Sequence, residues 1–182
     1  MPVKLKIVLG LFLSLVGLDQ LSKIWVVRTL DYGRDELSII PGFLSFVHAQ
    51  NPGAAMGLFT SFTYRLPLFL VFTVAAVWVL WTMYRQIADT DRLQASMVGC
   101  ILAGAVGNLI DRVHKQSVTD FIRVYTENHG VVAWLHGYGL PAEWPTFNIA
   151  DTAIVIGVGL YVVHYLFVER PAAKALASGT HQ

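Results

Sequence analysis

Four long apolar runs dominate the pattern of hydrophobic and polar positions along the chain. Each run approaches the length of about 20 residues that an α-helix needs to cross a bilayer. The pattern therefore predicts four transmembrane helices, at Ile7–Val27, Leu66–Tyr84, Leu93–Ile110 and Ile149–Val168. The first run lacks an Ala-x-Ala cleavage site and continues through Asp19 and Lys23, which favours a retained span over a cleaved signal peptide.

Two long connections between the spans carry patterns of their own. Residues Leu37–His48 are rich in β-branched and aromatic side chains around Pro41-Gly42, which predicts two short strands joined by a turn, within an outer β element at about 35–60. The connection at about 121–147 is rich in Trp, Tyr, Gly and Pro. Because Trp and Tyr favour the water–lipid interface, we expect a partly ordered flap there.

The composition agrees with a membrane protein. Of 182 residues, 55% are hydrophobic and 14% are charged, against about 25% charged residues in soluble domains, and the mean hydropathy is +0.56. The formal net charge of +1, without a basic run, indicates no nucleic-acid partner. Cys100 is the only cysteine, which excludes an intrachain disulfide. We predict one mainly α, integral membrane domain over residues 1–182, with four transmembrane helices, a small extracytoplasmic β-sheet and a flap.

Basic residues set the expected orientation, because they favour the cytoplasmic side of a membrane. The two sides carry nearly equal numbers of basic residues. One side has Lys4, Lys6, Arg85, Arg92, Arg170 and Lys174, and the other has Arg28, Arg34, Arg112, Lys115 and Arg123. The first helix usually dominates, and its two early lysines place both termini in the cytoplasm. The two long connections then face outward.

Carboxylates beside the apolar runs are the candidate chemistry. The segment between the third and fourth spans leaves and re-enters the same membrane face, so Asp120 and Asp151 are expected to be neighbours. Two close carboxylates in a poor dielectric do not both ionise easily, and such a pair can activate water against a peptide bond without a metal. The alternative is that each aspartate caps a helix or pairs with an arginine.

Asp111 competes for a place in that pair. Asn108, Asp111 and Arg112 share one helix face by their i, i+3, i+4 spacing. Arg112 can pair with Asp111 and hold it ionised, which favours a structural role for this acid. Asn148 shares a face with Asp151 by the same spacing, and its amide either orients that carboxylate or donates to a substrate.

Two further polar motifs precede these acids. Asp19 and Lys23 lie at i and i+4 inside the first span, in the favourable order for an ion pair. We interpret them as an internal clamp near the outer end of the span, with substrate contact as the alternative. In the segment from Asn51 to Gly57, the small residue Gly53 permits close backbone approach, so Asn51 either presents its amide to an extended peptide or belongs to a simple turn.

Several other kinds of chemistry lack their sequence signatures. His129 and His136 are seven positions apart, and no zinc-binding spacing such as His-x-x-x-His occurs. A Gly-x-Ser-x-Gly turn and a phosphate-binding loop are also missing. We therefore expect no metal and no cofactor, and the sequence disfavours a serine hydrolase or a nucleotide-driven pump.

Five short motifs follow one another along the chain. They are Asp19-Gln20-x-x-Lys23, Asn51-x-Gly53-Ala54-Ala55, Gly107-Asn108-x-x-Asp111-Arg112, Val118-x-Asp120-Phe121 and Phe147-Asn148-x-Ala150-Asp151. In this order and spacing they resemble lipoprotein signal peptidase, the signal peptidase II family of aspartic peptidases in bacterial inner membranes. The resemblance runs from about Asp19 to Asp151.

The resemblance implies a reaction and a set of site residues. Family members cut prolipoproteins on the amino side of a diacylglyceryl-modified cysteine at the outer face of the inner membrane, and globomycin targets them. By this resemblance Asp120 and Asp151 match the catalytic pair. The other matches are Asn51, Asn108, Arg112 and Asn148 at the substrate site, with Gly53 in the same motif, Asp111 as a supporting acid, and Asp19 and Lys23 as an early polar pair.

The chain departs from the family pattern at two places. Met56 stands where an aromatic residue is common, and the segment from Asp120 to Phe147 is longer than usual. Two rival functions are a proton-coupled transporter, which predicts acids spread through several helices, and a noncatalytic assembly or lipid-binding protein. The favoured prediction is a monomeric peptidase whose partners are a prolipoprotein substrate and membrane lipid.

Overall fold

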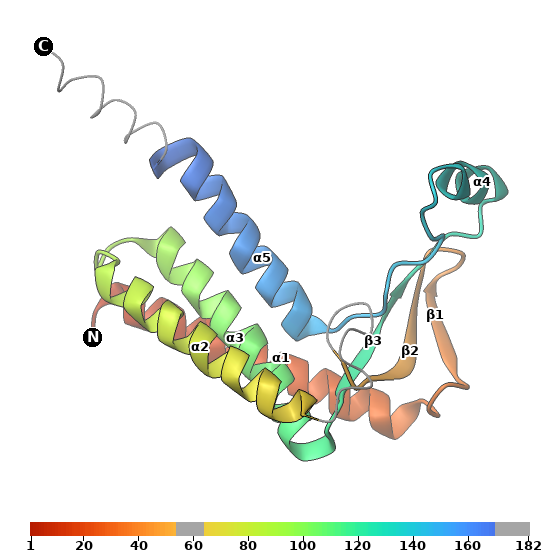
Figure 1. The fold of residues 1–182 in the computed structure, drawn as a ribbon, viewed down its shortest axis with the longest axis horizontal. Helices are drawn as coiled ribbons and strands as arrows, with labels where there is room; N and C mark the ends of the chain where they lie inside the picture. The colour runs from red at the N-terminus through yellow and green to blue at the C-terminus, as the bar shows by residue number, and fades with distance from the viewer. Residues whose placement is uncertain (54–63, 170–182) are drawn as a thin grey trace, which may run out of the picture.

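Four helices form a bundle in the computed structural model, which describes residues 1–53 and 64–169 (Figure 1). They are α1 (Val3–Thr29), α2 (Arg65–Gln86), α3 (Arg92–Lys115) and α5 (Ile149–His164), which continues into the π-helical turn η2 (Tyr165–Glu169). All four are long and apolar enough to cross a membrane. The predicted four-span architecture is confirmed.

The third helix extends beyond its predicted end at Ile110. It ends at Lys115, and Gln116 closes it in the left-handed conformation with a φ of 59°, donating its backbone N–H to the Arg112 carbonyl. The apolar run stops earlier because the last turn is basic, and basic side chains favour the negative end of the helix dipole. Hydropathy marked the apolar part of the helix and missed its polar last turn.

Small residues bring α3 and α5 close together. A Cβ added to Gly104 would overlap the carbonyl oxygen of Ala150 and lie 2.6 Å from Cγ1 of Ile154. A Cβ added to Gly157 would lie 2.6 Å from Cγ1 of Ile101. Small residues permit such close backbone approach between membrane helices. The crossing holds the first turn of α5 against α3.

Three antiparallel strands form a small sheet at one end of the bundle. They are β1 (Glu36–Ile40), β2 (Leu44–Asn51) and β3 (Val118–Val124), in the order β1-β2-β3. The predicted hairpin is present, with Gly42 in the left-handed region at a φ of 73°. The third strand, which carries Asp120, was not among the predicted elements. Its pairing depends on β2, far away in sequence.

Aromatic packing fastens the sheet to the end of α1. Val26 and Leu30 form a buried cluster with Phe121 of β3. The Phe46 ring of β2 meets the rings of Trp25 and Phe121 edge-on, with centroids 6.2 and 5.6 Å apart. These contacts join α1, β2 and β3 and fix the strand that carries Asp120 relative to the bundle.

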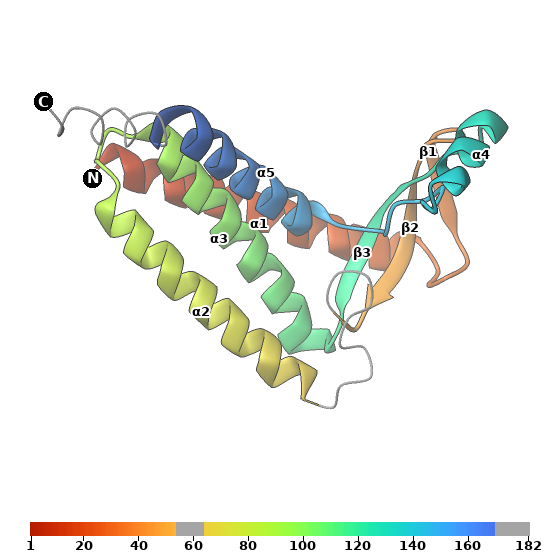
Figure 2. The same ribbon diagram turned by 45° about the horizontal axis from the view of Figure 1, so that its top comes forward.

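The flap contains one short helix, α4 (His129–Gly137), capped by the side chain of Asn128. It lies at the end of the sheet away from the helical bundle (Figures 1 and 2). Arg123 of β3 fastens the base of the flap, because its guanidinium pairs with Glu143 at 2.7 Å and with Glu36 at 2.9 Å. The flap is thus ordered at its base and extends away from the helices.

The opposite end of the bundle holds the start of α1 and the α2–α3 connection (Figure 2). Lys4 pairs there with Asp89 at 3.1 Å and donates to the Ile87 carbonyl at 2.7 Å. Several residues used in the sequence analysis lie outside the described residues: Ala54, Ala55, Met56, Gly57, Arg170 and Lys174.

Candidate active site

Asp120 lies at the buried, bundle-proximal part of β3. Its side chain is almost fully buried, with a relative exposure of 2%. One carboxylate oxygen accepts from the Asn51 amide at 3.1 Å, and the other accepts from the Asn148 amide at 2.7 Å. Three segments distant in sequence, the end of β2, β3 and the start of α5, therefore meet at this carboxylate.

Asp151 lies in the first turn of α5. It forms a capping box with Asn148: the Asn148 side chain accepts from the Asp151 backbone N–H, and the Asp151 carboxylate accepts from the Asn148 backbone N–H at 3.2 Å. Its other oxygen accepts from the Asn108 amide of α3 at 2.7 Å. The expectation that an aspartate caps a helix is thus correct for Asp151, which has a second contact across the bundle as well.

The two acids are joined through the amides of Asn108 and Asn148. The Asn148 amide nitrogen lies 3.1 Å from the Asn108 side-chain oxygen, so each amide serves one acid and contacts the other amide. The negative charge of Asp151 also acts on Asp120: burial first, and then this neighbouring charge, raise the pKa of Asp120 to about 6. Hydrogen bonds from the Asn51 and Asn148 amides and the positive charge of Lys23 lower the pKa of Asp120, but they only partly offset this rise.

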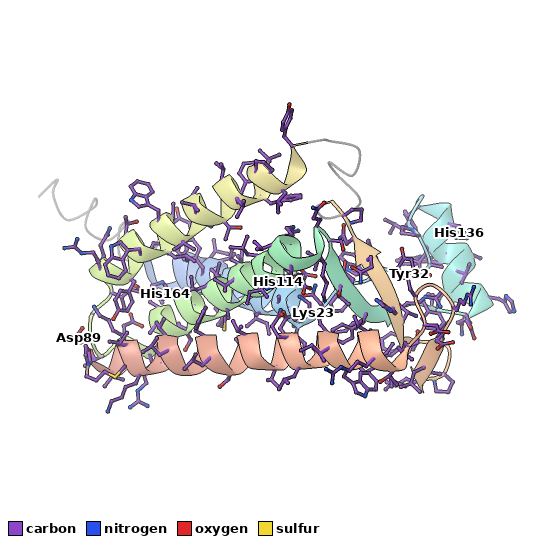
Figure 3. All side chains as sticks on the ribbon, turned by 90° about the horizontal axis from the view of Figure 1, so that it is seen from below. Lys23, Tyr32, Asp89, His114, His136 and His164 are labelled. Carbon is purple, nitrogen blue, oxygen red and sulfur yellow. The ribbon has the colours of Figure 1, made fainter. Side chains whose placement is uncertain are left out.

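Asp19, Lys23 and Asp111 form an ion triad that contacts this amide pair through Asn108. The Lys23 ammonium pairs with Asp19 at 2.8 Å and with Asp111 at 3.1 Å, and all three side chains are buried. Figure 3 shows Lys23 on α1, on the side that faces the other helices. The predicted clamp between Asp19 and Lys23 is present, and Asp111 joins it.

Asp111 and Arg112 do not interact as the spacing suggested. The cations that pair with Asp111 are Lys23 and, at 3.4 Å, Lys115. Within the described parts of the chain, Arg112 instead donates to the Gly53 carbonyl at 3.3 Å, and its guanidinium lies 4.4 Å from the centre of the Phe69 ring. A structural role for Asp111 agrees with this geometry, although the partners differ from those expected.

Asn51 forms the turn that was one of the two alternatives for its motif. Its side-chain oxygen accepts from the Gly53 backbone N–H at 3.0 Å, which makes the turn. Its amide donates to Asp120, which brings it into the site. Gly53 in turn contributes its carbonyl to Arg112.

Sequence reasoning missed two contributors to the site. The Thr119 backbone N–H donates to Asp111 at 3.1 Å, and the Ala150 backbone N–H donates to Asp19 at 3.0 Å. Each adjoins one of the paired acids in the chain. Backbone donors leave no signature in a sequence, and only the position next to an aspartate pointed to them.

Metal-ligating side chains do not cluster in residues 1–53 and 64–169: no group of three His, Cys, Asp or Glu there is arranged to hold an ion. The side chains that meet at this site comprise two neighbouring carboxylates, several amides and one guanidinium.

Comparison with known proteins agrees with this arrangement. The family described as "Signal peptidase (SPase) II" matches residues 11–167. This range includes the ion triad, Asn108 and Asn148, and both paired acids. The chain belongs to the signal peptidase II family. As a member of this family it is a peptidase of the aspartic type.

Individual relatives of this signal peptidase II family member cover most of its length. The lipoprotein signal peptidase of Geobacter sulfurreducens is 38% identical over 167 residues, 92% of this chain and 93% of the relative. That of Geobacter metallireducens is 38% identical over 86% of this chain and 88% of its own. A bacterial membrane enzyme solved in meso at 1.9 Å is 28% identical and superposes with a TM-score of 0.72, covering 88% of this chain and 93% of that one.

Proposed function

We propose that this protein removes signal peptides from diacylglyceryl-modified prolipoproteins, cutting on the amino side of the lipidated cysteine with water activated between Asp120 and Asp151. The observation that carries the proposal is a pair of acids, Asp120 buried and Asp151 half-buried, that are joined through Asn108 and Asn148. The lipoprotein signal peptidases that are 36–38% identical over most of the chain support the choice of substrate.

The surroundings of the two acids favour different roles. Asp151 accepts from a backbone N–H at the start of α5, where the helix dipole stabilises negative charge; it is the base that takes a proton from water. Asp120 is the more buried acid and has the raised pKa; in its protonated form it donates to the peptide carbonyl oxygen. One proton is shared by the pair, as in other aspartic peptidases.

The reaction then proceeds without a covalent enzyme intermediate. The water oxygen attacks the carbonyl carbon as its proton passes to Asp151, and the carbonyl oxygen takes the proton of Asp120. Collapse of the tetrahedral intermediate breaks the C–N bond, the amine of the cysteine takes the proton held by Asp151, and Asp120 regains its own. Arg112, Asn51 and Asn108 line the place where the extended peptide lies.

The position of the site suits a lipid-anchored substrate. The acids lie where β3 and the start of α5 meet α3, beside the small sheet and away from the end that holds Lys4. In the proposed orientation, with both termini cytoplasmic, this is the outer face of the bacterial inner membrane. The acyl chains of the cysteine remain in the bilayer while the scissile bond reaches the acids.

The test is cleavage of a diacylated prolipoprotein by purified protein in detergent, followed as a shift to a shorter product. Asp120→Asn and Asp151→Asn are each expected to lower the rate by about 10³-fold or more, because each removes an acid–base partner. Asp89→Asn, at the opposite end of the bundle, is the matched control and is expected to cleave normally. Parental cleavage by either of the first two folded variants would reject the proposal.

A further inference from the structure

Lys23 contacts three groups of the site and neither of the paired acids. Its ammonium lies 2.8 Å from Asp19, 3.1 Å from Asp111 and 3.1 Å from the side-chain oxygen of Asn108. The side chain is 1% exposed. A lysine so enclosed makes no direct contact with a substrate, so any influence on catalysis passes through its three partners and through its charge, which lowers the pKa of Asp120.

Both acids of the triad hold the main chain beside a catalytic aspartate. Asp19 accepts from the Ala150 N–H, next to Asp151, at 3.0 Å. Asp111 accepts from the Thr119 N–H, next to Asp120, at 3.1 Å. Because Lys23 joins the two carboxylates, it connects the start of α5 to β3 by a continuous chain of buried polar contacts.

Lys23 also helps to orient the Asn108 amide, whose oxygen accepts from the Asn148 amide as well. An ammonium group only donates hydrogen bonds, so the amide oxygen of Asn108 turns toward it at 3.1 Å. The amide nitrogen is then left facing Asp151, to which it donates at 2.7 Å. A reversed amide would set its N–H groups against the ammonium and its oxygen against the carboxylate, and both contacts would be repulsive.

We propose that Lys23 is a positioning residue for hydrolysis, which sets the spacing of the two catalytic acids through Asp19 and Asp111 and orients the Asn108 amide toward Asp151. This inference rests on the proposed function. The competing role is simple neutralisation of buried acids, in which Lys23 stabilises the fold and has no separate effect on the chemical step.

The two roles differ in how kcat and KM respond. The experiment measures both constants with a diacylated prolipoprotein, normalised to folded protein from size-exclusion chromatography and thermal unfolding in detergent. Lys23→Met is expected to lower kcat by about 10²-fold, since small misplacements of catalytic groups have effects of this order. KM is expected to stay within about threefold, because no substrate contact is lost.

Two further variants separate positioning from stability. Lys4→Met removes an ion pair at the other end of the same helix and is expected to lower the unfolding temperature while kcat stays parental. Asp19→Asn/Lys23→Met keeps the net charge of the triad and leaves an acceptor for Ala150. It is expected to fold and to show a kcat about tenfold or more below that of Asp19→Asn alone.

The outcomes are distinct from those that test the proposed function. If Asp120→Asn is inactive while folded Lys23→Met has the parental kcat, the positioning role is overturned and the proposed function stands. Equal kcat values for Asp19→Asn and the double variant would overturn it as well. If neither Lys23 variant yields folded protein, Lys23 is a folding determinant only, and the inference fails.

Discussion

Asp120 illustrates how a single residue couples function to stability. Its pKa is raised from near 3.8 to about 6, so the native state binds more protons than the unfolded state between these values. Stability therefore falls as pH rises through that window, and the loss is complete above it. In the proposed mechanism Asp120 acts in its protonated form, and near neutral pH its ionised form lowers the stability of the fold.

Removing the charge of Asp120 is therefore expected to stabilise the protein. Asp120→Asn is predicted to raise the free energy of unfolding at pH 8 by about 1–2 kcal/mol, with the gain vanishing near pH 4, because the pKa shift acts only on the ionised form. Thermal unfolding in detergent at both pH values measures it. Asp89→Asn, whose carboxylate is exposed, is the control. An equal gain at both pH values would contradict this account.

Single residues were predictable where their contacts are local. The Asp19–Lys23 pair and the shared face of Asn148 and Asp151 follow from helical spacing, and the structure contains both. The contacts of Asp111 with Lys23 and Thr119, and of Arg112 with Gly53, were not predictable in this way. They depend on how α1 and β3 pack against α3 and on where Gly53 lies, whereas the contact between Asp111 and Lys115 has the spacing of one helical turn.

The contact between α3 and α5 is the element-scale feature on which the site depends. Gly104 has no room for a methyl group beside Ala150, which lies next to Asp151. Gly104→Ala is predicted to lower stability by about 1–3 kcal/mol through overpacking and to reduce cleavage, because it displaces the start of α5. Thermal unfolding and the cleavage assay measure the two effects.

The control is Gly159→Ala, on α5, the other helix of this contact. A Cβ at that position meets nothing within 4 Å. This variant is expected to retain both stability and cleavage, apart from a small gain in helix propensity. A similar loss in both variants would show that the effect of Gly104→Ala is not due to packing against Ala150.

Arg123 adds side-chain ion pairs to the backbone hydrogen bonds at the base of the flap. Arg123 pairs with Glu36 of β1 and with Glu143 of the flap, and these partly exposed pairs contribute about 1 kcal/mol or less. Arg123→Met is predicted to leave global unfolding nearly unchanged and to speed hydrogen exchange at Thr126 and Trp144, whose N–H groups bond across the flap base. Unchanged exchange there, as expected for the exposed control Arg34→Met, would contradict this role.

Elements were predictable to the extent that their patterns are local. The four spans and the β1–β2 hairpin follow from hydropathy and turn residues. The strand β3 did not follow, because its residues Val118–Val124 need β2 as a partner before a strand is favoured. The helix α4 was expected only as part of a flap, since its nine residues have no buried face to produce a clear apolar period.

At the scale of the whole molecule, the bundle has two chemically different ends. The described start of α1 and the α2–α3 connection share one end, and the sheet and flap lie at the other (Figures 2 and 3). The even number of spans agrees with this arrangement. Which end faces the cytoplasm rests on the two early lysines, because the basic residues as a whole are nearly balanced.

Cysteine labelling in intact cells tests that orientation. In a Cys100→Ala background, a membrane-impermeant maleimide is predicted to label Gly137→Cys in the flap and to leave Thr90→Cys in the α2–α3 connection unlabelled until the inner membrane is disrupted. Cys100 itself is buried, so the parent protein serves as a low-background control. The reverse labelling pattern would place the flap, and with it the acids, on the cytoplasmic side.

The ion triad has a consequence for how the chain enters the bilayer. Lys23 and Asp19 lie one helical turn apart on α1, and Asp111 and Lys115 lie one turn apart on α3. Each of these four side chains thus has a counter-ion on its own helix, and an isolated charge in hydrocarbon would be costly. The ion pair between Lys23 and Asp111 forms only when the two helices meet, so the proposed hydrolytic centre is completed by lateral association of helices whose charges are already paired.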